Sequence, residues 1–199
     1  MDWADAAAVP DALAEADAWL AEARHSDREH WASTFAPRDV QDLHGEINLL
    51  RHLPLPVMVR ATEGTSTQEL RRVLHAAATA GAEVEVSVPQ QPLADAALAA
   101  GISEAAVRLE DAAAFAARVP TLEQSRIRLL GEADDALRRA LAERIEVALF
   151  TGAVVASGRV ELLPFLHEQA ISATNHRYGD PLPHALDLNG GRGWARGCA

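Results

Sequence analysis

Few residues in this chain of 199 amino acids could serve as nucleophiles or metal ligands. The single cysteine, Cys198, lies next to the C-terminus, where a thiol lacks the base and the fixed surroundings that catalysis requires. The eight histidines are scattered, and none has the H-E-x-x-H spacing that places two imidazoles on one helix face for zinc. One cysteine also excludes an internal disulfide. The sequence therefore predicts no catalytic residue and no metal ligand.

The turn at residues 61–66 is where a dinucleotide-binding domain would hold a pyrophosphate. Such a site needs G-x-G-x-x-G, so that backbone amides can approach the phosphates. This turn has one glycine, Gly64, and the neighbouring Glu63 would repel a phosphate. We interpret Gly64, Thr65 and Ser66 as a turn with a helix cap and predict no cofactor-binding residue. A small nucleotide-binding module at the carboxyl ends of the strands remains an alternative.

Several side chains are candidates for contacts with another chain or domain. Large aromatic residues on a short N-terminal element usually dock on a core or on a partner. Alternation over Ile171 to Tyr178 predicts a strand, which is either a solvated edge or an arm that pairs with another sheet or subunit. The predicted interaction residues are Trp19, Trp31, Phe35, Glu168, His176, Arg177 and Tyr178.

Strands and helices alternate through the middle of the chain. Short apolar runs predict strands at 55–60, 84–88, 105–109, 126–130 and 147–150. Helical periodicity predicts helices between them. The first follows an N-cap at Thr65-Ser66-Thr67 and ends at Gly81, and the others are at 93–100, 112–118 and 134–144. This alternation predicts an α/β fold: an open, Rossmann-like, mostly parallel five-stranded sheet with helices on both faces.

Two further elements flank this domain. Periodicity predicts an N-terminal amphipathic helix over residues 11–28. It also predicts a short C-terminal helix over Leu162 to Ala170, ahead of the strand arm, and the seven-residue spacing of Glu161 and Glu168 places them on one face. The predicted domains are 1–53 (N-terminal helix and connecting segment), 54–157 (Rossmann-like domain), 158–184 (C-terminal helix and strand arm) and 185–199 (flexible tail).

Composition narrows the classes of partner. Hydrophobic residues make up 49% of the chain, enough for a folded core, and the net charge of −11 disfavours nucleic acid and anionic membranes. No apolar run approaches the roughly 20 residues of a membrane span, and residues 1–20 lack the basic start of a signal peptide. We therefore predict a cytoplasmic protein that neither binds nucleic acid nor spans a membrane.

Four segments, in order, resemble one enzyme family. They are the Trp31-x3-Phe35-Ala36-Pro37 segment, Leu43 to Pro54, Arg126 to Gly131, and Gly158 to Pro181. The chain resembles, over roughly residues 31–181, the C-terminal region of L-glutamate γ-semialdehyde (1-pyrroline-5-carboxylate) dehydrogenases of the aldehyde dehydrogenase superfamily. The similarity is to the actinobacterial forms and to the bifunctional proline-utilisation flavoenzymes.

The resemblance implies a place in a larger enzyme. In that family the catalytic cysteine, the glutamate of the aldehyde site and the NAD-binding segments lie upstream of the matched region, so no such role, and no NAD, is assigned to this chain. A similar C-terminal domain helps to cover the catalytic unit through a terminal arm, which residues 176–178 match. The resemblance implies a non-catalytic domain that packs on a catalytic aldehyde dehydrogenase unit or on a second copy. NAD-dependent oxidation of glutamate γ-semialdehyde by a split or complete enzyme is the alternative.

Overall fold

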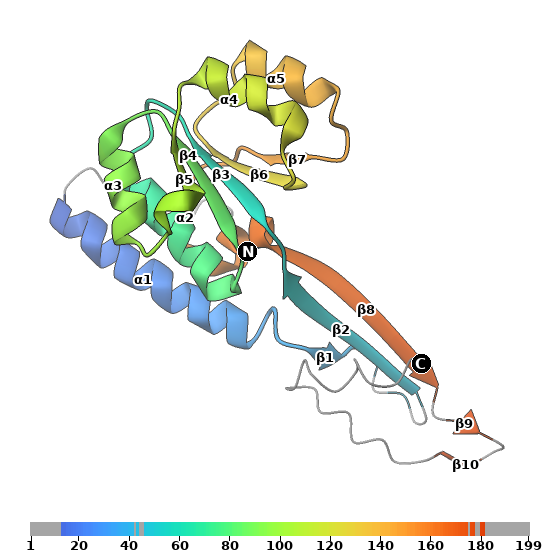
Figure 1. The fold of residues 1–199 in the computed structure, drawn as a ribbon. Helices are drawn as coiled ribbons and strands as arrows, with labels where there is room; N and C mark the ends of the chain where they lie inside the picture. Colours follow the sequence, from blue (N-terminus) through green and yellow to red (C-terminus); the bar gives the residue numbers. More distant parts are fainter. Residues whose placement is uncertain (1–12, 42, 44–45, 175, 178–179, 182–199) are drawn as a thin grey trace. The chain divides into compact units, whose positions relative to one another are not determined.

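The computed structural model describes residues 13–41, 43, 46–174, 176–177 and 180–181 (Figure 1). The chain divides into two compact units, residues 1–34 with 54–166 and residues 35–53 with 167–199. The predicted flexible tail at 185–199, which includes Cys198, lies outside the described residues. Within the described part, no helix is long and apolar enough to cross a membrane.

The first unit is built on a parallel sheet of five strands in the order β5-β4-β3-β6-β7 (Figure 1). The strands are β3 (Val57–Ala61), β4 (Val84–Val88), β5 (Val107–Leu109), β6 (Arg126–Leu130) and β7 (Ala148–Phe150). The central strand β3 is buried at every position. After β5 the chain returns to the other side of β3, so the strand order reverses between β3 and β6.

Helices cover both faces of this sheet (Figure 1). Their bounds are α1 (Leu13–Ala32), α2 (Thr67–Ala80), α3 (Gln91–Ala99), α4 (Ala112–Arg118), α5 (Asp135–Ala142) and α6 (Gly158–Glu161), and short 3₁₀ turns are η2 (Glu104–Ala106), η3 (Val119–Thr121) and η4 (Leu163–Phe165). Helix α2 packs between α1 and α3, whereas α4 packs on α5. The predicted α/β fold, with its five-stranded parallel sheet and helices on both faces, is confirmed.

One buried ion pair joins α1 to α2, and another joins α6 to the sheet. Arg72 of α2 donates from Nη1 and Nη2 to the two carboxylate oxygens of Asp27 on α1, both at 2.8 Å. Arg128 of β6 donates from Nε to Glu161 Oε1 at 2.8 Å. All four side chains are at least 97% buried. Buried charges are tolerated only when paired and hydrogen-bonded in this way.

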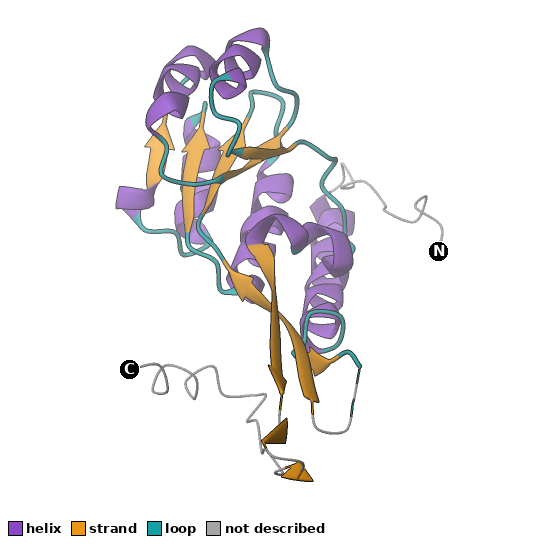
Figure 2. Cartoon of the chain, turned by 90° about the vertical axis from the view of Figure 1, so that its right-hand side faces the viewer, coloured by secondary structure: helices purple, strands orange, loops and turns teal. Residues whose placement is uncertain are grey.

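The second unit contains a three-stranded sheet in the order β1-β2-β8. Its strands are β1 (Arg38–Asp39), β2 (Glu46–Pro54) and β8 (Leu166–Thr174), and the short strand β9 (His176–Arg177) pairs antiparallel with β10 (Asp180–Pro181). Strands β2 and β8 run side by side (Figure 2). The sequence had indicated only a connecting segment where β2 forms.

The predicted helix over Leu162 to Ala170 is wrong. Pro164 lies in the short turn η4, and the chain is already extended at Leu166, where β8 begins. From that point the residues pair with β2, and this distant partner overrides the local helical pattern. As a result Glu161 ends α6 and Glu168 lies on β8, so the two carboxylates do not share a helix face.

Candidate functional site

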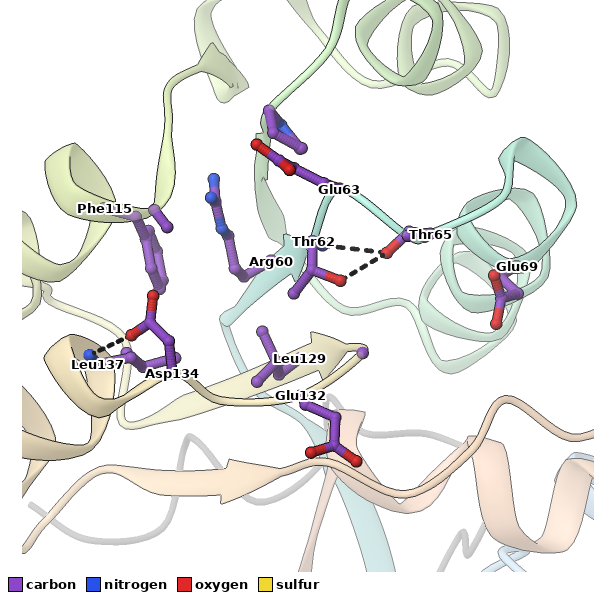
Figure 3. A pocket seen from close by; sticks show the side chains of 14 residues that line it. Arg60, Thr62, Glu63, Thr65, Glu69, Phe115, Leu129, Glu132, Asp134 and Leu137 are labelled. Carbon is purple, nitrogen blue, oxygen red and sulfur yellow. Dashed lines mark hydrogen bonds between the residues drawn. The ribbon is translucent and has the colours of Figure 1, made fainter.

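A pocket of about 510 Å³ opens at the carboxyl ends of β3 and β6 (Figure 3). This is the point where the strand order reverses, and open α/β sheets bind their ligands at such switch points. The turns after these strands supply Glu63 and Glu132, and α4 contributes Phe115. The fold therefore provides a ligand-sized hollow in the place where this architecture usually has one.

Arg60, near the end of β3, is the one cationic side chain among the residues that line the pocket. It is 97% buried and lies over the ring of Phe115, with its guanidinium carbon 4.9 Å from the ring centroid. Its Nη1 donates to Ser87 Oγ at 2.7 Å and to the Glu110 carbonyl oxygen at 2.9 Å. Burial lowers the pKa of Arg60, and nearby Glu110 and Asp111 offset this only in part.

Behind the pocket, Glu110 links Arg60 to the rest of a polar network. Its Oε1 accepts hydrogen bonds from Ser87 Oγ at 2.6 Å and from Arg118 Nη2 at 2.5 Å. Burial alone would raise the pKa of Glu110, but the bonds from Arg118 and Ser87 outweigh it and hold that pKa below its ordinary value. Glu110 is therefore held as a carboxylate, and Arg60 is held at the pocket wall.

The structure confirms a turn with a helix cap at Gly64, Thr65 and Ser66. Ser66 Oγ accepts from the Glu69 backbone N–H at 3.2 Å, and Glu69 Oε2 accepts from the Ser66 backbone N–H at 2.8 Å. Thr65 Oγ1 donates to the Leu130 carbonyl oxygen, which ties the turn to β6. Because the capping box already places a carboxylate at the start of α2, a phosphate would meet negative charge there.

At the pocket wall, the turn after β6 lies very close to the turn after β3. Gly131, after β6, has a φ of 105°, and a Cβ at this position would lie 2.1 Å from Thr62 Oγ1. Only glycine fits here without a shift of Thr62. Nearby, Asp134 caps α5 by accepting from the Leu137 backbone N–H at 2.7 Å. The pocket is thus shaped by turns held through specific hydrogen bonds.

In the second unit, two of the predicted interaction residues meet at His52 on β2. The rings of Phe35 and His52 stack edge to face with centroids 4.9 Å apart, and His52 Nδ1 lies 3.3 Å from the Phe35 carbonyl oxygen. Glu168 Oε1 of β8 lies 3.7 Å from His52 Nε2. Alongside, Arg51 Nε donates to Gln169 Oε1 at 2.6 Å. Sequence reasoning missed His52 because it did not predict β2.

The remaining predicted interaction residues are divided between the two units. Trp19 is buried and Trp31 is half-buried, and both lie on α1. His176 and Arg177 form β9, and Tyr178 lies outside the described residues. No group of three or more His, Cys, Asp or Glu side chains placed to hold a metal ion occurs in the part of the chain that the structure describes.

Neither a protein-family model nor a curated protein matches the chain. Among solved structures, the chain is similar to proline utilization A (PutA) from Corynebacterium freiburgense, with 27% sequence identity and a TM-score of 0.55 over 86% of this chain. The same comparison covers 15% of that PutA chain. The resemblance to the proline-utilisation enzymes that the sequence predicted is confirmed, and the chain corresponds to a small part of such an enzyme.

Two other solved structures are similar at lower identity. PutA from Bdellovibrio bacteriovorus matches with 18% identity and a TM-score of 0.48, over 68% of this chain and 15% of that one. Histidinol dehydrogenase from Elizabethkingia anophelis matches with 15% identity and a TM-score of 0.51, over 73% of this chain and 36% of that one. At these identities, both likenesses are of fold alone.

Proposed function

We propose that this chain is a non-catalytic domain of the proline-catabolic aldehyde dehydrogenase type, which acts by packing on a catalytic unit or on a second copy of itself. The observation that carries this proposal is the match to PutA, which extends over 86% of this chain but 15% of the larger enzyme. A domain of that extent has its own core and sheet and makes up a minor share of the assembly.

The second unit supports a role in packing. Strand β8 is nine residues long and stands at one edge of the β1-β2-β8 sheet. An edge strand presents backbone N–H and C=O groups that can pair with another chain. The contact of His52 with Phe35 and Glu168 holds the flanks of β2 in place. We propose that β8 and the segment after it form the contact surface.

The test compares the full chain with two truncations by sedimentation velocity, alone and with a separately produced PutA catalytic region. We expect the full chain and a chain lacking residues 185–199 to associate, and a chain lacking residues 167–199 to remain unassociated. The shorter truncation is the matched control, because it removes a tail and leaves β8 intact. Association that survives the loss of residues 167–199 would contradict the role of β8.

The catalytic alternative is tested on the same preparation. We expect no NADH formation when the purified full chain is given glutamate γ-semialdehyde and NAD. Turnover that persists after purification and disappears in Cys198→Ala would overturn the non-catalytic proposal, because Cys198 is the single thiol available as a nucleophile.

A further inference from the structure

The pocket at the carboxyl ends of β3 and β6 has no part in the packing role proposed above. Packing by the second unit would require neither a hollow nor a buried cation in the first. Yet the pocket wall holds Arg60, which is 97% buried. Burying a guanidinium is costly unless its donors find acceptors. The pocket therefore calls for an explanation of its own.

Within the described residues, the protein satisfies only part of the Arg60 guanidinium. Both of its hydrogen bonds to protein leave from Nη1, toward Ser87 and Glu110. Arg60 Nε and Nη2 donate no hydrogen bond to the described part of the chain. Neither nitrogen is among the fully buried polar atoms that lack a hydrogen-bond partner in that part, so both can be reached from outside. The Nε–Nη2 edge is the side of a guanidinium that binds a carboxylate through two parallel bonds. This edge is available at a residue that lines the pocket.

The rest of the pocket is acidic. Glu63, Glu69, Glu132 and Asp134 line it together with Arg60. The Glu69 and Asp134 carboxylates already accept hydrogen bonds from backbone N–H groups at the starts of α2 and α5, whereas the Glu63 and Glu132 side chains are in exposed positions at the two turns. One cation and four carboxylates leave the lining with an excess of negative charge. A phosphate or a dicarboxylate would be repelled, and a simple diamine would set a cation against Arg60.

We propose that this pocket binds a small α-amino acid that carries no net negative charge, with its carboxylate on the Nε–Nη2 edge of Arg60 and its ammonium groups toward the acidic rim that includes Glu63. This ligand class satisfies both signs of charge in the lining. An amino acid with a second ammonium group matches the excess of carboxylates better than a neutral one. A hollow of about 510 Å³ leaves room for such a side chain.

The test is isothermal titration calorimetry of the full chain with L-lysine and with two five-carbon compounds, cadaverine and glutarate. L-lysine has the carboxylate and two ammonium groups, cadaverine lacks the carboxylate, and glutarate lacks the ammonium groups. We expect saturable binding of L-lysine with a Kd of about 1 mM or lower, and binding of cadaverine and glutarate at least roughly tenfold weaker. Unspecific attraction to a chain of net charge −11 would instead favour cadaverine, and that order of affinity would overturn the proposal.

Three variants assign the binding to the pocket. Arg60→Met keeps the length of the side chain but removes the guanidinium that would bind the carboxylate of the ligand. Glu63→Gln removes one exposed charge at the pocket rim and leaves the core unchanged. Arg108→Met is the matched control, because Arg108 is exposed and pairs with Glu85. We expect lysine binding to fall at least roughly tenfold in Arg60→Met, severalfold in Glu63→Gln, and to stay unchanged in Arg108→Met.

Because Arg60→Met changes a buried network, Glu63→Gln decides the matter if Arg60→Met does not fold. Unchanged lysine affinity in Glu63→Gln, or no saturable binding to the full chain at 10 mM lysine (about tenfold above the expected Kd), would overturn the proposal. The experiment needs neither a partner nor residues 167–199, so its failure would not bear on the packing role, and failure of that role would not bear on this site.

Discussion

Protonation of the Glu110 carboxylate, behind the pocket, should lower the stability of the folded protein. Its folded-state pKa lies below the ordinary value of 4.5, since its bonds to Arg118 and Ser87 outweigh the effect of burial. Its stabilising contribution is therefore present above the unfolded-state pKa and is lost as pH falls through the lower folded-state pKa. We predict that Glu110→Gln lowers the free energy of unfolding by about 1–3 kcal/mol at pH 7, and that the difference from wild type narrows toward pH 3.

Urea unfolding of both proteins at pH 7 and at low pH measures this effect. Glu123→Gln is the matched control, because Glu123 is exposed and should change stability little at either pH. An equal difference between wild type and Glu110→Gln at both pH values would show that the network does not depend on the Glu110 charge.

At the same scale, sequence reasoning found some members of each cluster and missed others. It selected Phe35 and Glu168 but not His52, the side chain that both of them contact. It rejected a phosphate site beside Glu63, but it did not select Arg60, which lay inside a strand that was correctly predicted as buried. An arginine in an apolar run is a usable signal, because a buried charge requires partners.

Among the elements, α1 and α6 approach so closely that a glycine is required between them. A Cβ on Gly158 would lie 2.6 Å from the backbone Cα of Asp27, and backbone cannot move aside as a flexible side chain can. We predict that Gly158→Ala lowers the free energy of unfolding by about 1–3 kcal/mol, the usual cost of overpacking. Gly152→Ala is the control, since nothing lies within 4 Å of a Cβ there.

Thermal unfolding followed by circular dichroism compares the two variants with wild type. A Gly158→Ala midpoint equal to that of Gly152→Ala would mean that α1 and α6 separate readily. The comparison also bears on the Asp27–Arg72 pair, because Gly158 packs against the residue that provides the carboxylate of that pair.

Helices and strands that depend on nearby residues were predicted accurately, whereas strands that pair with distant parts of the chain were not. The strands at 84–88 and 126–130 and the helix at 112–118 have their predicted bounds, because local pattern and burial agree there. Strands β2 and β8 were missed or shifted because they depend on each other across the chain, as the 118-residue separation of Arg51 and Gln169 shows. The sequence did point to the turn at 61–66, which lines the pocket, but it could not show that the turn after β6 lies beside it, because one sequence does not reveal the strand order.

At the scale of the whole molecule, the first unit should fold without the C-terminal segment. Its five strands, its apolar core and both buried ion pairs lie within residues 13–34 and 54–166. We predict that a chain ending at residue 166 unfolds cooperatively, with a midpoint close to that of the full chain. A chain that lacks residues 1–34 should have a clearly lower unfolding midpoint. It loses the Asp27–Arg72 pair and the buried side chains of α1 that pack in the first unit, among them Trp19 and Leu20.

Differential scanning calorimetry of the full chain and the two truncations measures the difference. A chain ending at residue 166 that lacks a cooperative transition would mean that the first unit depends on the second for its stability. Equal stability of the two truncations would mean that the Asp27–Arg72 pair contributes little. If the first unit does fold alone, any loss of association on removing residues 167–199 can be assigned to β8 and the segment that follows it, because unfolding of the sheet is then excluded as its cause.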